Sequence, residues 1–518
     1  MANARSRRRF LVDSGKLALG FTLGSSVLGA AACGSGSSSS PLVSPSAWKE
    51  LARRISGQVL RPGDDGYLET ALPNNLRYAS HLPAGIAMCQ NPNDVAQSIL
   101  WSRQHAIPLI TRSGGHSYAG YSTTRGLMID VSPINHADYD PSTGIVTIGG
   151  GIRNKALYAA LEAANATITH GRCTGVGGAA FVLGGGIGFN MRRFGLACDL
   201  MVETQLVTAD GNIVTANSSE NPDLFWACAG AGGGNYGINT EFQLRTFPVS
   251  DLTVFNITWT SDPESLYTAL IAALQAGPPT LGTRVSLNAV TPEQLKSGTD
   301  VSVGLLGQLV GTPDELAEIL APAYAVSTPV AATIQVMPYW QAQIDFLSET
   351  GSPNRYQEKS AFFQDVPSAQ AIDTAFSWAR RWPGTSEQAG MVVFQTGDQV
   401  NAIAPDATAF VHRDSDWLMT VVVDWTSKDS DALVRQNLDW QKDFYAAMRE
   451  FTTGAFVNFI DPTLKSWEQD YYGSNLPRLE SIKAAVDPHQ VFHFPESIRP
   501  GSGTSSNANR FKGLVESA

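Results

Sequence analysis

The sequence predicts an α+β fold built from two regions of different character. Short β-like runs alternate with helix-like runs from about residue 47 to residue 247, and longer apolar runs typical of a buried sheet dominate from residue 248 to about 450. Of the 518 residues, 43% are hydrophobic and 16% are charged. This composition is typical of a globular chain, and the length is sufficient for two domains that each bury a core.

The first region is predicted to contain both element types in close alternation. Residues 94–104 (DVAQSILWSRQ) have apolar side chains at helical spacing, and a further helix is expected at 154–165. Asp210-Gly211 divides the two apolar stretches of residues 205–216, which is a strong signal for a β-hairpin. Further strands are predicted in three apolar runs, at residues 107–111, 126–132 and 144–152.

The second region, residues 248–450, is predicted to be an antiparallel sheet covered by helices. A helix is expected from Pro313, because Thr312 is a suitable N-cap and Glu315 completes a capping box. The predicted strands are five apolar runs, at residues 251–260, 283–291, 301–311, 391–395 and 417–425.

The N-terminus has the features of a targeting segment. SRRRFL at residues 6–11 is followed by a mildly apolar run at 17–29 and then by AAAC, which resembles a twin-arginine export signal; that pathway moves folded proteins. The run is too short and glycine-rich for a membrane span. We expect a leader at 1–32, a Ser/Gly/Pro linker at 33–46 and a tail at 501–518.

Export would place the protein outside the cytoplasm, as a secreted, periplasmic or cell-surface protein. Cys33 is either the lipid-bearing cysteine of a lipoprotein or the first residue after ordinary cleavage. The formal net charge is −11, which argues against nucleic acid or anionic membrane as a partner. The five cysteines show no regular spacing, so neither a disulfide framework nor a metal site is expected, and the sequence carries no signal for an oligomeric state.

Three glycine-rich clusters stand out in the first region, at residues 111–122 (TRSGGHSYAGYS), 173–188 and 230–238. Glycine-rich turns let the backbone approach a large phosphate-bearing ligand, although they can also simply shape turns. The sequence has no GxxxxGK[ST] motif, and the Gly149 to Gly151 run has Asn154 where the dinucleotide fingerprint needs its third glycine. The familiar nucleotide motifs are therefore absent from this sequence.

His116 and Cys173 add a nucleophile to each of two glycine clusters. A loop histidine is by default a surface or capping residue, and a cysteine is by default a small core side chain. Two such ligands without a further partner make a poor metal site. The remaining interpretation is covalent attachment of an electrophilic cofactor ring to both side chains, with the glycine loops around its phosphates.

These residues resemble the berberine-bridge-type FAD-linked oxidases of the vanillyl-alcohol-oxidase fold, whose cofactor domain is the PCMH-type FAD-binding domain. The resemblance runs from about residue 72 to residue 500. RSGGHS is similar to the family's FAD-pyrophosphate loop, and Cys173 stands eleven residues before Gly184, as the family's cysteine stands before its glycine triplet. The resemblance implies a bicovalent FAD, bonded through its 8α-methyl to His116 and through C6 to Cys173.

Further similar segments are MRRFGLACD, GGGNYGI, KSAFF, DATAFVHR and the C-terminal segment at 471–498. They imply an FAD domain in two pieces, 47–247 and 451–500, and a substrate domain at 248–450 whose sheet roofs the flavin. The residues expected to contact FAD are Arg112, Ser113, Gly114, Gly115, His116 and Ser117; Cys173, Val176, Gly177, Gly184, Gly185 and Gly188; Gly234, Asn235, Gly237 and Ile238; and Tyr472 and Asn475.

The resemblance also implies an activity. Family members transfer a hydride from a small organic substrate, such as a carbohydrate or a secondary metabolite, to flavin N5 while a base takes the alcohol proton. Molecular oxygen then reoxidises the flavin and yields hydrogen peroxide. The small Val176, three residues beyond Cys173, favours this use of oxygen as the electron acceptor. Two alternatives remain: a dehydrogenase that uses a quinone or protein acceptor, and a flavin-binding protein without turnover.

The sequence departs from the family at its catalytic tyrosines. Ile187, Phe456 and Phe459 stand where family members often have phenols, so the usual base cannot be carried over. Asp398 and Asp424, from the predicted substrate sheet, and Tyr472, which is also expected to pack near the flavin, are the candidates that remain. A substrate that needs no base is a further alternative.

Overall fold

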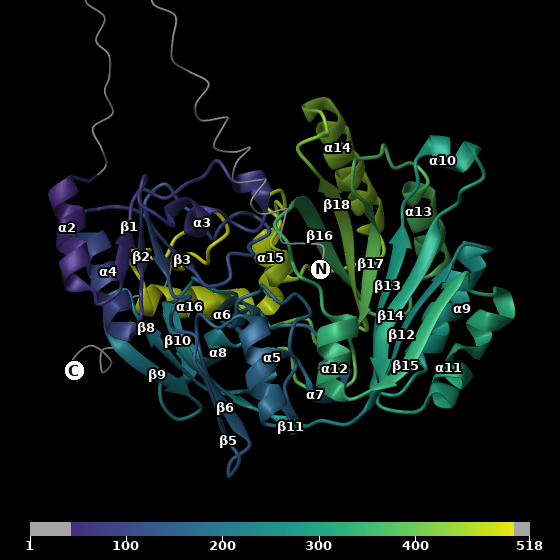
Figure 1. Ribbon diagram of the computed structural model, residues 1–518, viewed down its shortest axis with the longest axis horizontal. Helices are drawn as coiled ribbons and strands as arrows, with labels where there is room; N and C mark the ends of the chain where they lie inside the picture. The colour runs from purple at the N-terminus through teal and green to yellow at the C-terminus, as the bar shows by residue number, and fades with distance from the viewer. Residues whose placement is uncertain (1–42, 502–518) are drawn as a thin grey trace, which may run out of the picture. The chain divides into compact units, whose positions relative to one another are not determined.

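The structure, a computed structural model that describes residues 43–501, places two groups of sheets side by side (Figure 1). Strands coloured purple to blue form the first group, and strands coloured teal to green form a seven-stranded sheet. The C-terminal residues, in yellow, return to the first group. The predicted leader, Cys33, most of the predicted linker and nearly all of the predicted tail lie outside the described residues.

A four-stranded sheet opens the first group, in the order β1-β2-β4-β3. Strands β2, β4 and β3 run parallel to one another. Helix α4 (Pro92–Gln104) makes the crossover connection between β2 and β3. This confirms the helix expected at 94–104 and the strands expected at 107–111 and 126–132. The bounds are β1 Gln58–Leu60, β2 Gly85–Met88, β3 Leu109–Arg112 and β4 Leu127–Asp130, with helices α2 Pro45–Arg54, α3 Tyr67–Ala71 and η1 Leu76–Tyr78 nearby.

A five-stranded antiparallel sheet, in the order β5-β6-β10-β8-β9, completes the main part of this group. The predicted hairpin around Asp210-Gly211 is confirmed, because β8 (Met201–Val207) pairs with β9 (Ile213–Asn217) and Gly211 has a positive φ of 79°. The helix expected at 154–165 is α5 (Asn154–Ala163). The other strands are β5 Ala137–Asp140, β6 Ile145–Gly149 and β10 Ile238–Arg245, and β7 Ala166–Thr167 pairs with β11 Phe247–Pro248.

Short helices connect these strands and form the C-terminal return. They bury apolar side chains in one cluster with the five-stranded sheet, which joins the return to the first group. The connecting helices are α6 Gly178–Leu183, α7 Met191–Phe194, η2 Ala197–Leu200 and α8 Pro222–Cys228, and the return contains η4 Val457–Phe459, α15 Trp467–Tyr472, η5 Gly473–Asn475 and α16 Leu476–Val486.

The second group is one seven-stranded antiparallel sheet, in the order β15-β12-β14-β13-β17-β18-β16. All five strands expected in this region are present, and helix α11 (Pro313–Val326) begins after Thr312 with the expected capping box. Two strands without a distinct sequence signal were missed, β15 and β16. The bounds are β12 Leu252–Trp259, β13 Leu281–Asn288, β14 Ser302–Leu309, β15 Ala331–Met337, β16 Arg355–Phe363, β17 Ala389–Gln395 and β18 Trp417–Trp425.

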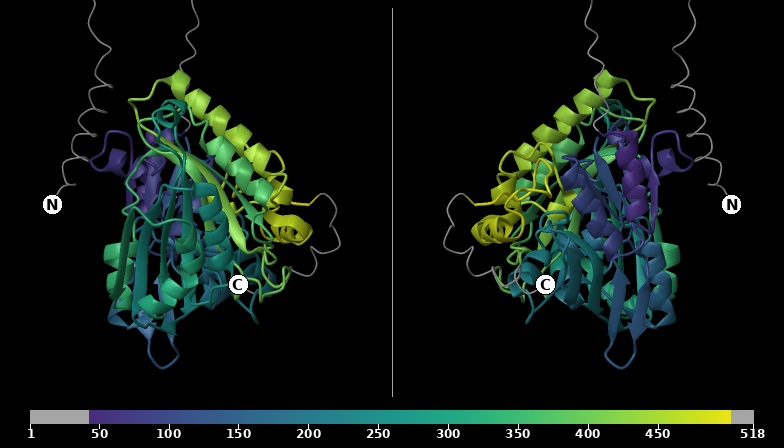
Figure 2. Two further views of the ribbon diagram at one scale, coloured as in Figure 1. Left: turned by 90° about the vertical axis from the view of Figure 1, so that its right-hand side faces the viewer. Right: turned by 90° about the vertical axis from the view of Figure 1, so that its left-hand side faces the viewer.

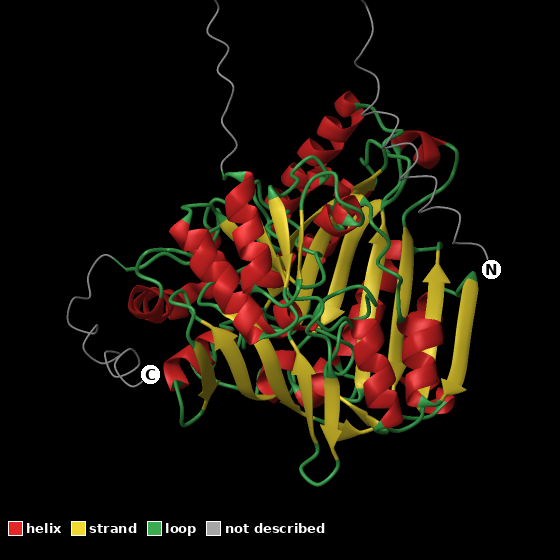
Figure 3. Cartoon of the chain, turned by 60° about the vertical axis from the view of Figure 1, so that its left-hand side comes forward, coloured by secondary structure: helices red, strands yellow, loops and turns green. Residues whose placement is uncertain are grey.

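Helices cover one face of this sheet, and its other face is turned toward the first group (Figures 1 and 3). Val285, Val393 and Val421 pack beneath the helices in one apolar cluster. The long helix α14 runs from the sheet toward the C-terminal return (Figure 2). The helices of this region are α9 Pro263–Gln275, α10 Pro292–Lys296, α11, α13 Ala369–Ala379 and α14 Asp431–Met448, together with α12 Tyr339–Gln341 and η3 Ala342–Leu347, which pack in the apolar cluster of the first group. Among residues 43–501, no helix is both long and apolar enough to cross a membrane.

Candidate active site

A cavity of about 560 Å³ lies between the first group of sheets and the open face of the seven-stranded sheet. Each of the three glycine clusters contributes to its wall, as do the C-terminal residues 456–460. Segments that are far apart in the sequence therefore meet around one space. Its size and partly apolar lining are typical of a cofactor or small-molecule site.

Two glycine loops are packed backbone against backbone at one end of this cavity. A Cβ atom at Gly114 would lie 2.3 Å from the Gly177 nitrogen, and one at Gly177 would lie 2.2 Å from Ser113 Oγ. Gly115 has a positive φ of 76°, which turns the chain after β3 and directs His116 into the cavity. These glycines are therefore needed for the close approach that brings the two loops together.

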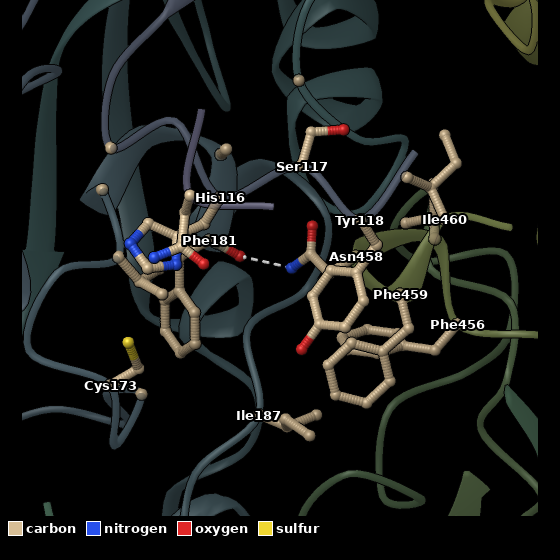
Figure 4. Close-up of a pocket in the computed structure, with 18 of the residues that line it drawn as sticks. His116, Ser117, Tyr118, Cys173, Phe181, Ile187, Phe456, Asn458, Phe459 and Ile460 are labelled. Atoms are coloured by element: carbon tan, nitrogen blue, oxygen red, sulfur yellow. Dashed lines mark hydrogen bonds between the residues drawn. The ribbon is translucent and has the colours of Figure 1, made fainter. Parts of the chain in front are cut away.

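His116 and Cys173 converge on the same small volume (Figure 4). A Cβ atom at Gly351 would lie 1.9 Å from Cys173 Sγ and 3.2 Å from His116 Cε1. A Cβ atom at Gly175 would lie 2.8 Å from His116 Nε2. Glycines at 175 and 351 keep this volume clear, so both nucleophiles can face one bound ring.

Burial decides the protonation of both nucleophiles. Desolvation, aided by the charge of Arg153, lowers the pKa of His116 to about 4, so its imidazole is neutral near pH 7 and retains a nucleophilic lone pair. Desolvation raises the pKa of the Cys173 thiol, although backbone N–H groups at Gly175 and Val176 oppose the rise. Burial therefore favours the neutral thiol form of Cys173.

The third glycine cluster leaves space in the cavity for a large ligand. Gly233 does not have a positive φ, and a Cβ atom there would meet no atom of the protein closer than 3.7 Å. Neither a positive φ nor contact with other protein atoms therefore requires glycine at position 233. Gly233 lines the cavity, so the lack of a side chain there leaves room for a bound ligand. Next to it, the Asn235 side chain is fixed by bonds to the Ala231 carbonyl and the Ile498 N–H.

The open face of the seven-stranded sheet gives the cavity a polar wall. Glu358 on β16, Asp424 on β18 and Arg284 on β13 all line it, together with Tyr118 from the first glycine loop. Burial raises the pKa of Glu358 to about 7 and that of Asp424 to about 6. This wall can hold polar groups of a substrate and exchange protons with them near neutral pH.

Comparison with known proteins identifies the chain. Residues 83–217 match the family described as "FAD binding domain", and residues 455–499 match the family described as "Berberine and berberine like". The uncharacterized FAD-linked oxidoreductase YgaK of Bacillus subtilis (strain 168) is 30% identical over 460 residues, which cover 86% of this chain and 98% of that protein. The chain belongs to the FAD-linked oxidoreductases.

Other relatives of this oxidoreductase have assigned activities. The carbohydrate oxidase of Microdochium nivale is 28% identical over 476 residues, 85% of this chain and 92% of that protein. Among solved structures, Physcomitrella patens BBE-like 1 has a TM-score of 0.80 at 26% identity, covering 88% of this chain and all of that chain. A glucooligosaccharide oxidase from Acremonium strictum, described with a 6-S-cysteinyl, 8α-N1-histidyl FAD, shares the fold, with a TM-score of 0.79 at 23% identity and the same coverage.

Most residues predicted for the cofactor or the chemistry lie in the cavity wall of the oxidoreductase. Because no ligand is bound in the structure, their contact with FAD stays a prediction. They are Ser113, Gly114, Gly115, His116, Ser117, Cys173, Val176, Gly177, Gly188, Gly234, Asn235, Gly237, Ile238, Asp424 and Tyr472.

Five predicted residues are not brought to the cavity wall. The Arg112 guanidinium donates to the backbone carbonyls of Ser122, Thr70 and Leu72. Two of the other four are packed: Gly184 lies against the Asn458 amide and Gly185 against Phe410. The Asn475 amide donates to the carbonyls of Pro405, Thr408 and Ala409, and Asp398 pairs with Arg192 at 2.6 Å.

The apolar replacements of the family tyrosines do face the cavity. Ile187, Phe456 and Phe459 lie together opposite the His116 and Cys173 side (Figure 4). Tyr118 packs on Phe459, with ring centroids 5.1 Å apart. This part of the wall supplies shape and no proton acceptor, as the sequence indicates.

Tyr472 is a poor candidate for a base. Its hydroxyl donates to the Ala231 carbonyl at 3.0 Å, and burial raises the pKa of the phenol further above its ordinary value. The ring packs in the cluster beneath the five-stranded sheet, beside Trp467 and Tyr471. The structure therefore favours its expected role as a packed aromatic in the cavity wall.

Glu358, Arg284 and Tyr118 were not predicted from the sequence. Glu358 and Arg284 lie in strands β16 and β13, and the sequence does not show which face of each strand will be covered by other elements. Tyr118 lies only two residues after His116, and this proximity was the one usable signal.

Proposed function

We propose that the chain is a covalently flavinylated FAD-dependent oxidase of small hydroxyl-bearing molecules, with carbohydrates as the favoured substrate class. FAD would be bonded to a ring nitrogen of His116 and to Cys173 Sγ. The observation that carries the proposal is the convergence of these two nucleophiles on the volume left by Gly175 and Gly351. A bound oxidised flavin would accept a hydride from a C–H bond of the substrate.

The remaining predicted contacts give each loop a role. The backbone at 113–117 and 232–235 would approach the phosphates of the cofactor, because glycine leaves the N–H groups accessible. The polar wall formed by Glu358, Asp424 and Arg284 would face the substrate. This arrangement places the cofactor loops and the substrate-selecting sheet on opposite sides of one cavity.

The substrate class is supported by the relatives and by the polar wall. Carbohydrate, xylooligosaccharide and glucooligosaccharide oxidases occur among the relatives, at 26–28% identity. Carboxylates, a guanidinium and the Gln388 amide line the cavity and can bond to the several hydroxyls of a sugar. A panel of sugars, alcohols and amines tests the class, since a true substrate bleaches the oxidised flavin under anaerobic conditions.

The double tether is tested by the intact mass and absorption spectrum of acid-denatured protein. The unmodified protein should keep its flavin, His116→Ala and Cys173→Ala should each retain one bond, and the double variant should release the flavin. His489→Ala, at an exposed histidine, and Cys89→Ala, at a buried cysteine outside the cavity wall, are the controls and should keep both bonds. Release of flavin from the denatured unmodified protein would overturn the double tether.

Oxygen is the proposed electron acceptor, supported by the small Val176 in the cavity wall beside Cys173. The alternative is a dehydrogenase that passes electrons to a quinone or a protein. Rapid reoxidation of the reduced flavin by air, with one hydrogen peroxide formed per substrate oxidised, is expected of the oxidase. Slow reoxidation by air together with fast reoxidation by a quinone would instead show the dehydrogenase.

We also propose that the chain is exported through the twin-arginine route. The supporting feature is the SRRRFL segment at residues 6–11, followed by the apolar run and AAAC. Cys33 then carries a lipid or follows the cleavage site. The protein would act at the cell surface or beyond it.

A further inference from the structure

The strand register brings two carboxylates together above the cavity. On β16, Tyr356 pairs with Asp424 of β18, and Glu358 pairs with Val422. Residues two apart on a strand share a face, so Glu358 and Asp424 are diagonal neighbours on the face that lines the cavity. Diagonal neighbours of this kind are close enough for their charges to interact.

Glu358 is surrounded by groups that can share or stabilise a proton. Burial and the charge of Asp424 favour its neutral form, whereas the neighbouring Tyr118 hydroxyl and the charge of Arg284 favour its ionised form. The Arg284 Nε atom is buried and has no hydrogen-bond partner within the protein. Across the cavity Tyr356 packs edge-on against Tyr118, with ring centroids 5.1 Å apart.

The other two carboxylates in the cavity wall differ from Glu358 in their surroundings. Glu349 also lines the wall, but its side chain is 59% exposed and pairs with Arg172 at 3.5 Å. Asp424 is held next to Gln388, whose side chain favours its ionised form. Among residues 43–501, Glu358 and Asp424 are thus the two wall carboxylates without an ion-pair partner, and Glu358 is the one beside the Tyr118 hydroxyl and the Arg284 charge.

The geometry points to Glu358 as the group that accepts the substrate's hydroxyl proton, with Tyr118 as the residue that positions that hydroxyl. This inference rests on the proposed function. In the step, one O–H bond and one C–H bond of the substrate break and a C=O bond forms; the proton goes to a Glu358 carboxylate oxygen, and an oxidised flavin, when bound, would accept the hydride.

This assignment explains how the site can work without the family's phenols. Ile187, Phe456 and Phe459 leave no proton acceptor on the C-terminal side of the cavity. The sheet supplies one instead, from a strand that the sequence did not single out. Burial raises the pKa of Glu358 to about 7, and a base with a pKa near the working pH is the most effective.

The test compares Glu358→Gln, Asp424→Asn and the matched control Glu349→Gln in holoprotein. The first readout requires no substrate: the flavin absorbance is followed as a function of pH. In the unmodified protein and E349Q, Asp424 should titrate near pH 6, and the diagnostic step is that of Glu358 near pH 7. E358Q should lose the step, and D424N should keep it at a lower pH, because removal of a neighbouring negative charge lowers the pKa of Glu358.

The second readout is the rate of anaerobic flavin reduction by glucose, cellobiose and xylobiose. In the unmodified protein the rate should rise with pH through about 7, as Glu358 loses its proton. E358Q should reduce the rate by about 10²–10⁴-fold and remove this rise, while the intact mass still shows attached flavin. Tyr118→Phe should raise KM more than it lowers kcat, since Tyr118 is a positioning residue.

Three results would overturn the inference. The first is a reduction rate in E358Q within about threefold of the unmodified rate, and the second is survival of the spectral step in E358Q. The third is loss of both the spectral step and the flavin reduction in D424N alone, which would make Asp424 the base. Failure of the proposed function is distinguishable, because flavin is then released on denaturation or no compound of the wider panel reduces it. The spectral titration then decides by itself whether Glu358 titrates at this site.

Discussion

Glu496, in the C-terminal return, is a buried acid that should make stability depend on pH. Its side chain is 4% exposed, and its Oε2 atom has no hydrogen-bond partner within the protein. Burial and the charge of Asp461 raise its pKa to about 8, against the opposing charge of Lys359. Between about pH 4.5 and pH 8, the Glu496 carboxyl is protonated in the folded protein and ionised in the unfolded chain. Glu496 therefore destabilises the folded state increasingly as the pH rises toward 8.

We expect Glu496→Gln to raise the melting temperature at about pH 9, by about 1–3 °C, and to leave it nearly unchanged at about pH 5. The substitution puts a neutral amide in place of a carboxylate that is charged at the higher pH and neutral at the lower one. Differential scanning calorimetry at both pH values measures the effect. Glu318→Gln, at an exposed position on α11, should show no such pH dependence, and an equal shift at both pH values for E496Q would contradict the explanation.

Single residues were predictable from the sequence where the chemistry is local to a motif. His116 and Cys173 each lie in a glycine-rich loop with a fixed spacing, and the structure brings both to one volume. Arg112, in the same loop, is not in the cavity wall, because its guanidinium turns back to the carbonyls of Ser122 and Thr70, which a sequence does not show; its expected contact with FAD stays a prediction. Glu358 could not be found, since its role depends on pairing with a strand about sixty residues away.

At the scale of elements, one buried ion pair ties the C-terminal return to the seven-stranded sheet. Lys359 on β16 and Asp461 after η4 pair at 2.6 Å, with side chains 5% and 4% exposed. The Phe456 N–H also donates to Ser360 Oγ on the same strand, at 2.9 Å. These contacts fix the apolar segment 456–460 against the sheet that bears Glu358.

Asp461→Ala should destabilise the protein by about 3–5 kcal/mol, because it leaves the Lys359 ammonium buried without its partner. It should also weaken FAD retention in the His116→Ala/Cys173→Ala double variant, which lacks both proposed bonds, since residues 456–460 line the cavity. Urea unfolding followed by tryptophan fluorescence measures the first effect. Arg478→Ala is the control: its pair with Asp223 is exposed at 46% and 37%, so its loss should cost about 1 kcal/mol or less, and an equal loss in both variants would count against the burial argument.

Elements were predictable where local signals and burial agree. Helix α11 combines a capping box with an apolar stripe, and β17 and β18 are buried on both faces, so their continuous apolar runs identify them. Strand β15 was missed because it is an edge strand whose residues Ala331 to Val336 are all exposed, which removes any alternation. Strand β16 begins with the polar run RYQEKS, whose inner polar residues face the cavity or a buried partner.

At the scale of the whole molecule, the cavity is complete only when nearly the whole chain has folded. Its wall includes residues from Asn74 to Phe494, drawn from both groups of sheets and from the C-terminal return. The proposed attachment of FAD to His116 and Cys173 would therefore require most of the chain to be folded. A chain that receives FAD before export would then have to cross the membrane in its folded state.

This requirement leads to a prediction for the N-terminal segment. Replacing Arg7 and Arg8 by Lys in SRRRFL should retain the protein inside a bacterial host, as folded protein with flavin already attached. The reason is that the arginine pair is the signal of a route for folded proteins, and the proposed flavin attachment would require a folded cavity first. Cell fractionation with intact-mass detection of the flavin measures the outcome. Arg53→Lys, on helix α2, is the control and should be exported normally, whereas export of the Arg7/Arg8 variant at the unmodified level would show that another route carries the chain.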